Sequence, residues 1–363
     1  MIKPIIIGNI KVYLLWFDSM GAKSSSILIE TPDVKILVDP GAAEMQPSYP
    51  LPPEDKKELR RKALKVIKEA AQEADIIFIS HYHYDHHTLP SELSEIYEGK
   101  KLWIKDPNRW INKSQWGRAR LFLSQFYQMY EGKMIEQALK PPEEMEVRDP
   151  LKDLPLAMDK DFGDYKSRRN ELLAKGRVWF EKLATLWKNE PWICPFELGR
   201  EEISFADGKE FKLGSTTIRF SSPLFHGVEF DRLGWVVSMV LLCQGTKILY
   251  TSDLQGPIIE DYADWIVKEN PDILILDGPA TYLLGYMLNQ TNFRRTILNL
   301  NSILQNTSTQ IIIYDHHLPR DVHFKERMAK VYDMAREKGK TLITAAEWLG
   351  VGTPNLESVR ESK

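Results

Sequence analysis

The sequence predicts an α/β fold in which two β-sheets lie together with helices on the outside. Three observations favour this fold: strand-like apolar runs occur towards both ends of the chain, segments with helical spacing follow several of them, and a helix-rich stretch divides the pattern. We therefore expect residues 1–100 and 201–363 to form one discontinuous domain, and residues 101–200 to form a helical insertion.

The composition is that of an ordinary globular protein, with 43% hydrophobic and 27% charged residues. The formal net charge of −3 gives no reason to expect a nucleic-acid binder from bulk electrostatics. No apolar run reaches about 18 residues, so we expect no transmembrane helix, and the first residues are typical of a strand and not of a signal peptide. Cys194 and Cys243 form no CxxC pair. These features together predict a cytoplasmic protein with no membrane association.

In the first hundred residues, the runs SSILIE (25–30) and VKILVDPG (34–41) are separated by TPD, which predicts a hairpin. The segment EDKKELRRKALKVIKEAAQEAD (54–75) carries apolar residues at helical spacing after a proline-rich stretch. The wholly apolar run IIFIS (76–80) is typical of a strand covered on both faces.

The middle of the chain predicts helices over 114–139 and 165–189, and six of the ten tryptophans lie between residues 101 and 200. These helices could form a lid over a cleft, make a contact in a homo-oligomer, or enlarge the core. A tryptophan stripe at helical spacing is more often core than a substrate platform. The segment NRWINKSQWGRAR (108–120) mixes Arg and Trp as a path for single-stranded nucleic acid would, but it is one stretch only.

Strand patterns return from about residue 201. Candidate strands are EISF (202–205), EFKLG (210–214), TIRFSSP (217–223), WVVSMVLLC (235–243), KILYTSD (247–253), DILILD (272–277) and QIIIYD (310–315). Helices are expected over 258–270, 291–306 and 323–338.

The segment SHYHYDHH (80–87) concentrates four of the eight histidines and one aspartate directly after a predicted buried strand. His81 and His83 are two residues apart, so they point the same way if strand geometry persists. Asp85 and His86 follow as the chain turns. The segment therefore offers imidazoles to one divalent ion and a carboxylate with an imidazole to a second. Such ligands without a thiolate suit zinc, and less selectively manganese or iron.

Further candidate ligands stand at the ends of other predicted strands. His226 follows TIRFSSP, Asp253 ends KILYTSD, and His316 and His317 follow QIIIYD. A single aspartate after a strand is more often a cap or turn residue. Four strand ends with metal-binding side chains together predict a metal site.

The motif HYHYDHH, with ILVDPG before it and His226, Asp253 and His316 after it, resembles the metallo-β-lactamase superfamily of binuclear metallohydrolases. The resemblance covers roughly residues 1–100 and 201–350. It implies an αββα four-layer sandwich with two divalent metal ions, most readily zinc, at one edge of the sheets. The whole chain also resembles an archaeal branch of that superfamily, which supplies no substrate.

The resemblance also implies a ligand set, carried over by position. The first metal would be held by His81, His83 and His226, and the second by Asp85, His86 and His316, with Asp253 bridging both. DHHLPR resembles the superfamily pattern THFSPR when His316 takes the ligand position, and His317 remains the alternative ligand. Asp39 would brace the ligand loop without binding metal.

Several neighbouring residues have two interpretations. Asp277 either accepts a hydrogen bond from a ligating imidazole or caps a turn. His87 is better interpreted as a packed or hydrogen-bonding residue than as a ligand. Arg320 either holds an anionic substrate group or is a solvated surface residue.

The implied activity is hydrolysis of an ester, thioester, lactone or phosphodiester bond in a small molecule or phosphodiester substrate. Two ions sharing Asp253 would share a water whose pKa falls from about 15.7 to about 7, which supplies hydroxide as the nucleophile. Asp85 and Asp253 would hold the ions, and His317 or His323 would be the general acid. The alternatives are a nuclease or RNA-binding subunit on the same fold, or a metal-stabilised structural or sensor protein.

Overall fold

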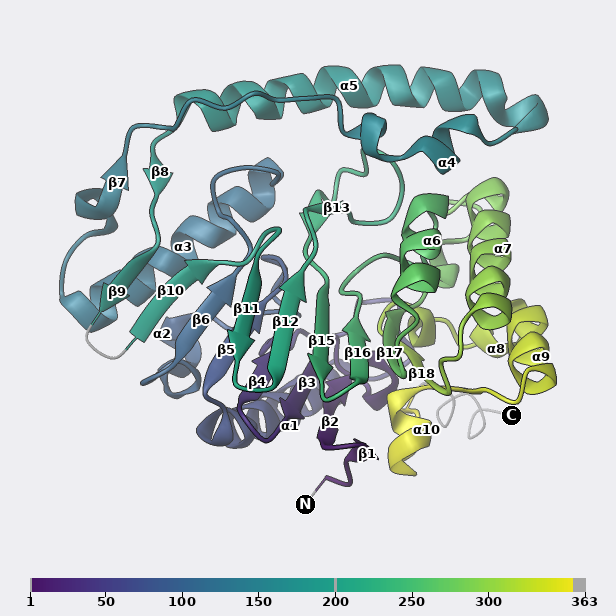
Figure 1. The fold of residues 1–363 in the computed structure, drawn as a ribbon, viewed down its shortest axis with the longest axis horizontal. Coiled ribbons are helices and arrows are strands. Elements are labelled where there is room, and N and C mark those ends of the chain that lie inside the picture. The colour runs from purple at the N-terminus through teal and green to yellow at the C-terminus, as the bar shows by residue number, and fades with distance from the viewer. Residues whose placement is uncertain (1, 199–200, 355–363) are drawn as a thin grey trace.

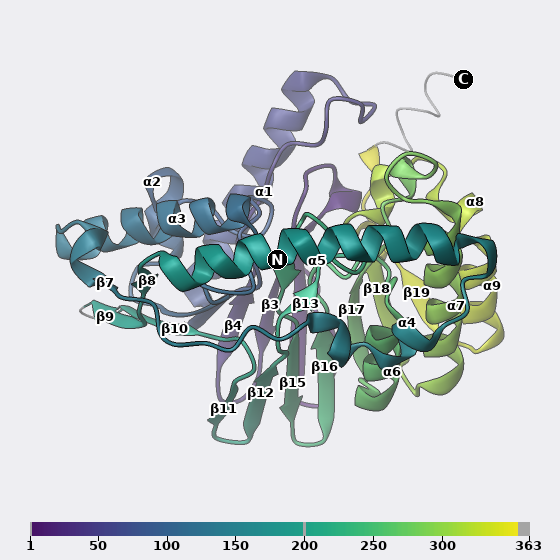
Figure 2. The ribbon, with the colours of Figure 1, turned by 90° about the horizontal axis from the view of Figure 1, so that it is seen from above.

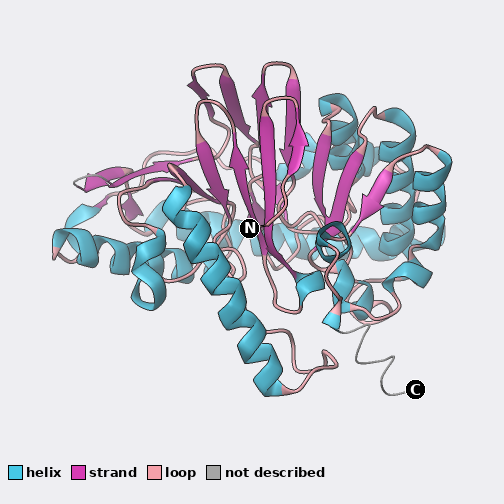
Figure 3. Cartoon of the chain, turned by 90° about the horizontal axis from the view of Figure 1, so that it is seen from below, coloured by secondary structure: helices cyan, strands magenta, loops and turns pink. Residues whose placement is uncertain are grey.

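Two mixed β-sheets pack face to face, and helices cover the outer face of each, which is the αββα sandwich that the sequence predicts (Figure 1). This computed structural model describes residues 2–198 and 201–354 of the 363-residue chain. Figure 3 shows the strands of both sheets in the centre, with helices on either side.

The first sheet is formed mainly by the N-terminal part of the chain. Its strands, in spatial order, are β1 (Ile5–Ile7), β2 (Ile10–Phe17), β3 (Ser25–Glu30), β4 (Lys35–Val38), β5 (Ile76–Ile79), β6 (Lys101–Ile104), β10 (Glu201–Phe205) and β9 (Phe196–Leu198). From β4 through β5 and β6 to β10 the pairing is parallel, and the rest is antiparallel.

The second sheet is formed by the C-terminal part. Its strands, in spatial order, are β11 (Glu210–Leu213), β12 (Thr216–Phe220), β15 (Met239–Cys243), β16 (Thr246–Tyr250), β17 (Ile273–Asp277), β18 (Ile311–Asp315) and β19 (Thr341–Ile343). The four strands from β16 to β19 are parallel. Each sheet thus joins an antiparallel half to a parallel half. The carboxyl ends of parallel strands share an edge of the sheet, where loops can build a site.

Side chains of the central strands alternate between two cores. In β5, Ile76 and Phe78 join the core between the sheets, whereas Ile77 and Ile79 join the core under the outer helices. β4 and β17 divide their residues in the same way. Because both faces are covered, a strand with period-two geometry has no polar side, which explains the uninterrupted apolar runs.

The helices form the two outer layers. α1 (Pro53–Glu73) and α3 (Lys113–Glu131) pack on the first sheet, and α6 (Glu260–Glu269), α7 (Gln290–Asn306) and α9 (Ala329–Glu337) pack on the second. The remaining α-helices of the described chain are α2 (Pro90–Leu93), α4 (Pro155–Asp159), α5 (Lys166–Asn189), α8 (Phe324–Arg327) and α10 (Ala345–Leu349).

Residues 101–200 contain strands as well as helices. β6 lies in the first sheet between β5 and β10, and the short strands β7 (Leu139–Lys140) and β8 (Trp192–Ile193) pair with each other. The tryptophans of this region contribute to the core, and Trp103, Trp187 and Trp192 are buried. The long helix α5 crosses above the sandwich, as the view from above shows (Figure 2).

Three predicted elements differ in detail. The helix expected to reach residue 139 ends at Glu131, because Gly132 adopts a left-handed φ of 64° and its N–H caps the helix. The helix expected over 323–338 divides at Met328 into α8 and α9. The run 235–243 divides into β14 (Trp235–Val236), which pairs with β13 (Leu224–Phe225), and β15, because Val237 N–H bonds to the carbonyl of Ser80 in another segment.

No helix in the described part of the chain is long and apolar enough to cross a membrane.

The core between the sheets sets the stability of the sandwich. Ile275 is 2% exposed in this core, so Ile275→Ala should lower the free energy of unfolding by about 2–5 kcal/mol. Ile6→Ala is a matched control, because Ile6 is 65% exposed in an edge strand, and it should change the value by less than about 0.5 kcal/mol. Urea denaturation of metal-free protein measures both. Equal losses in the two variants would contradict the assignment of this core.

Candidate metal centre

The loop after β5 is held by the loop after β4. The carboxylate of Asp39 accepts two hydrogen bonds from Ser80, one from the backbone N–H of Ser80 at 2.7 Å and one from its hydroxyl at 2.6 Å. The loop then turns on itself, with the N–H of His86 bonded to the carbonyl of His83 at 2.9 Å. The turn gathers the histidine and aspartate side chains at one point beyond the strand end.

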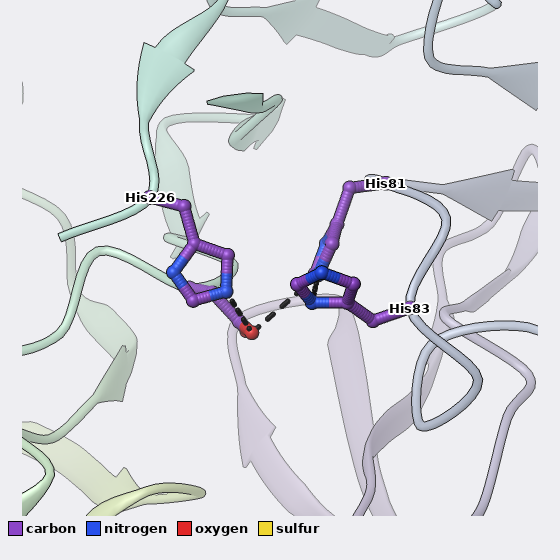
Figure 4. Close-up of side chains that lie close together, drawn as sticks. His81, His83 and His226 are labelled. Carbon is purple, nitrogen blue, oxygen red and sulfur yellow. Dashed lines mark hydrogen bonds and ion pairs between the residues drawn. The ribbon is translucent and has the colours of Figure 1, made fainter. Parts of the chain in front are cut away.

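One group of potential ligands comes from three segments. His81 and His83 follow β5, and His226 follows β13 (Figure 4). Asp253 comes three residues after β16. One ligand atom of each residue lies within 4.8 Å of the others. His81 Nε2 is 3.0 Å from His83 Nδ1, and His226 Nε2 is 3.0 Å from Asp253 Oδ2. This geometry can surround one cation.

A second group lies on the other side of Asp253. Asp85, His86 and His316 place ligand atoms within 4.8 Å of one another. His86 Nε2 and His316 Nε2 are 3.2 Å apart, and they are 3.1 and 3.3 Å from Asp253 Oδ1. The two carboxylate oxygens of Asp253 thus face different groups, as a bridging ligand would.

Two buried carboxylates orient the imidazoles of the second group. Asp39 Oδ2 is 2.7 Å from His86 Nδ1, and Asp18 Oδ1 is 2.9 Å from His316 Nδ1. A carboxylate bonded to Nδ1 leaves the Nε2 lone pair of each ring directed at the other. In the first group, Ser80 Oγ is 3.1 Å from His81 Nδ1.

These atoms fit a divalent metal, because their own contacts leave lone pairs unsatisfied. Both carboxylate oxygens of Asp253 are buried and accept no hydrogen bond from the described residues. Nitrogen lone pairs that face each other at about 3 Å repel unless a cation or a proton lies between them. Burying such a cluster without a cation is costly, and histidine and aspartate are ligands that zinc accepts.

The electrostatics of the two groups differ. Burial lowers the pKa of His83 to about 3, so this ring is neutral and can donate its lone pair. Burial also disfavours charge on His86, but Asp253 and Asp39 outweigh it and raise the pKa of His86 to about 10. For the Asp253 carboxyl, burial opposes ionisation, yet His86 and His316 hold its pKa well below the usual range. The carboxylates therefore attract positive charge to the second group.

His317 lies beside the proposed ligands and forms a third group of possible ligand atoms with Asp253 and His316. Its Nδ1 is 2.9 Å from Asp277 Oδ1, and its ring centroid is 5.8 Å from that of His226. Asp277 also accepts the backbone N–H groups of His317 and Gln255. Asp277 therefore joins the loop after Asp253 to the loop after β18.

The other residues singled out from the sequence occupy varied positions. His87 is buried, its Nδ1 bonds to the carbonyl of His83, and it is in no ligand group found among the described residues. His323 is 56% exposed and pairs with Glu326. Arg320 is buried and bonds to Asp18, so it is not the solvated side chain that the sequence leaves open.

The sequence analysis missed Asp18 and Tyr250. Asp18 orients His316 from 298 residues away and also accepts the N–H of Ser24. Tyr250 donates its hydroxyl to Asp39 at 2.7 Å. Neither belongs to a local motif. The one available signal was an aspartate directly after the apolar run that forms β2.

Comparisons with known proteins agree with this architecture. A family profile described as "Metallo-beta-lactamase superfamily" matches residues 21–302, more than half of the chain. A UPF0282 protein of Korarchaeum cryptofilum is 33% identical over 345 residues, covering 95% of this chain and 91% of that protein. A UPF0282 protein of Methanopyrus kandleri is 33% identical over 362 residues, covering 97% and 98%.

The solved structures to which the chain is similar are more distant than these relatives. The metallo-beta-lactamase fold protein YhfI from Bacillus subtilis matches 93% of this chain and 96% of its own, with 13% identity and a TM-score of 0.42. Unliganded yeast PDE1 matches 93% and 97%, with 12% identity and a TM-score of 0.45.

The role of Asp39 in orienting His86 can be measured through metal affinity. Asp39→Asn replaces one carboxylate oxygen by an NH₂ group, which cannot accept hydrogen bonds, so we expect zinc affinity to fall by about 10–100-fold. Competition with a zinc-chelating dye gives the affinity. Asp333→Asn, at an exposed position on α9, is the control and should bind zinc as the unmodified protein does. Unchanged affinity in folded Asp39→Asn protein would contradict the orienting role.

Proposed function

The chain belongs to the metallo-beta-lactamase superfamily and to its UPF0282 branch, as the resemblance predicts, and from this membership we propose that it is a metal-dependent hydrolase. We propose that it cleaves an ester, thioester, lactone or phosphodiester bond with activated water. The observation that carries the proposal is the meeting of two groups of ligand atoms at the carboxylate of Asp253.

The proposed ligand set follows these groups. His81, His83 and His226 would hold one divalent ion, and Asp85, His86 and His316 a second, with Asp253 shared between them. His316 is preferred to His317 because its Nε2 lies 3.2 Å from that of His86 and 3.3 Å from Asp253 Oδ1. Zinc suits this donor set, and manganese or iron could replace it.

Bound divalent ions would supply an acidified water as nucleophile and would polarise the oxygen of the scissile group. The protein's own contribution is to fix the donors. Asp18 and Asp39 hold two rings from behind, and the buried surroundings of His81 and His86 keep bulk water from competing with substrate.

We propose His317 as the general acid. Burial raises the pKa of the Asp277 carboxyl well above its usual range and lowers the pKa of His317, so Asp277 can keep a proton and donate it to Nδ1 at 2.9 Å. Nε2 then carries the N–H, which passes to the leaving group as the Asp277 proton moves to Nδ1. The proposal is supported by the distance of 5.8 Å between the ring centroid of His317 and that of His226, one of the proposed ligands. His323, the other candidate, is exposed and bonded to Glu326, which supports His317 instead.

The nucleic-acid alternative gains no support from the segment 108–120. The ring of Trp110 packs against Phe180 and Trp187 at 5.4 and 5.7 Å, and Trp116 is covered by the guanidinium of Arg120 at 3.5 Å. These rings are therefore not free to stack with bases.

Asp253 is the position at which the proposed function is tested first. Zinc-loaded protein should hydrolyse members of a panel of nitrophenyl esters, thioesters, lactones and phosphodiesters, and Asp253→Asn should reduce turnover to background with loss of bound zinc. Elemental analysis and steady-state rates on the same samples measure both. Asp333→Asn serves as the control. A zinc-loaded protein that leaves the whole panel untouched would overturn the proposal.

The general acid is tested by leaving-group chemistry. His317→Ala should slow hydrolysis of an alkyl ester or diester by about 10²–10⁴-fold, because its poor leaving group needs a proton. The same variant should change the rate with a nitrophenyl leaving group far less, because that group departs without protonation. His323→Ala is the matched control and should leave both rates unaltered. An equal loss with both leaving groups would rule out proton donation by His317.

A further inference from the structure

A hollow of about 340 Å³ lies between the insertion helix α5, the loop after His226 and the N-terminal turns of α7. The backbones approach closely here. A Cβ at Gly176 of α5 would lie 2.5 Å from the side chain of Phe230, so glycine allows the helix to rest on the loop. This loop forms one wall of the hollow with residues 228–232.

A second hollow of about 280 Å³ adjoins the first along α5. Both are lined by Lys175 and Arg232, and the second adds Lys182 and Trp179. The two hollows therefore meet at a pair of cationic side chains. Arg232 is exposed and forms no ion pair among the described residues, whereas Lys175 is 64% exposed and pairs with Glu171 on the same helix.

The first hollow is lined by more cationic side chains than carboxylates. Its lining includes four cationic side chains and two carboxylates: Arg169, Lys175, Arg232 and Arg295, with Glu229 and Asp231. Glu229 Oε1 bonds to both Arg169 and Arg295 at 2.8 Å, and Glu260, outside the lining, also pairs with Arg295 at 2.7 Å. Arg232 is therefore the cation of this lining that has no carboxylate partner among the described residues. The Nε of Arg169 is buried and has no acceptor among the described residues.

The hollow adjoins the proposed metal centre through the loop that carries His226. A Cβ at Gly227 would lie 2.9 Å from Gln255 Oε1 and 3.2 Å from Asp231 Oδ2, so these two side chains meet beside it. Gln255 Nε2 is in turn 3.4 Å from His226 Nδ1. A molecule seated in the hollow therefore lies against the residues that surround one proposed ligand.

We propose that the hollow under α5 is the substrate subsite for an anionic group, and that Arg232 and Lys175 bind a phosphate carried by a small organic substrate. This proposal rests on the proposed function only in that the bound molecule is called a substrate. The binding itself depends on the cationic side chains. Arginine and lysine both form charge-assisted hydrogen bonds to phosphate oxygens.

A small substrate fits better than a nucleic-acid strand. Trp179 is the aromatic ring of the second hollow, and it is stacked on Trp235 with an angle of 2° between the rings. The guanidinium of Arg232 lies 4.8 Å from its centroid. Because these two contacts cover Trp179, the aromatic ring of the second hollow is not free to stack with a base.

Binding of glycerol 2-phosphate to zinc-loaded full-length protein tests the proposal, with tryptophan fluorescence as the signal. Arg232→Ala and Lys175→Ala should each weaken binding by about tenfold, because each removes one charge-assisted contact. Lys188→Ala is the matched control, since it removes the same charge from an exposed position on α5 outside both hollows. Glycerol, without the phosphate, should not bind.

Two further arms separate this proposal from others. Asp253→Asn should still bind glycerol 2-phosphate, which separates failure of the subsite from failure of the proposed hydrolase. Equal affinity in Arg232→Ala, Lys175→Ala and Lys188→Ala proteins would overturn the subsite. Tighter binding of a short single-stranded oligothymidylate, lost in Arg232→Ala, would identify nucleic acid as the phosphate source and overturn the assignment to a small substrate.

Discussion

The convergence of lone pairs on a buried point is the constraint on which the rest of this structure depends. The Nε2 atoms of His86 and His316 lie 3.2 Å apart, and both face the carboxylate of Asp253, which accepts no hydrogen bond from the residues that the structure describes. Such an arrangement is unfavourable without a positive charge in it. The carboxylates of Asp18 and Asp39 keep the rings in this orientation by hydrogen bonds to their Nδ1 atoms. The fold therefore holds these lone pairs in an electrostatically unfavourable arrangement, and a bound cation would relieve their repulsion.

The backbone around the centre carries strain as well. Asp39, Ser252 and His316 adopt left-handed φ values of 46°, 54° and 65°, which are uncommon for residues with a side chain. All three stand just after a strand of the central sheets, where the chain must turn sharply to aim a side chain inwards. Strain of this kind persists where surrounding contacts over-determine the conformation. Here the sandwich supplies those contacts through its two buried cores.

Much of this arrangement could be predicted from local sequence. The buried strands were visible as apolar runs, and the polar residues that end them, such as Asp253 and His316, marked the edge where the centre forms. Contacts between distant segments were not visible. Asp18 meets His316 across 298 residues, and nothing near Asp18 indicates that partner. The division of the run 235–243 was also hidden, because it depends on a hydrogen bond to Ser80 from a different part of the chain.

Helix α5 has a mechanical consequence for the whole sandwich. Its 24 residues give a rod of about 36 Å. Near one end, Trp187 donates its indole N–H to Ile111, beside the first sheet, and near the other, Arg169 pairs with Glu229 and so with Arg295 of α7, on the second. Because α5 is attached to both halves of the sandwich, it resists a hinge motion that would separate the two sheets. Movement of one half relative to the other would first have to break these contacts.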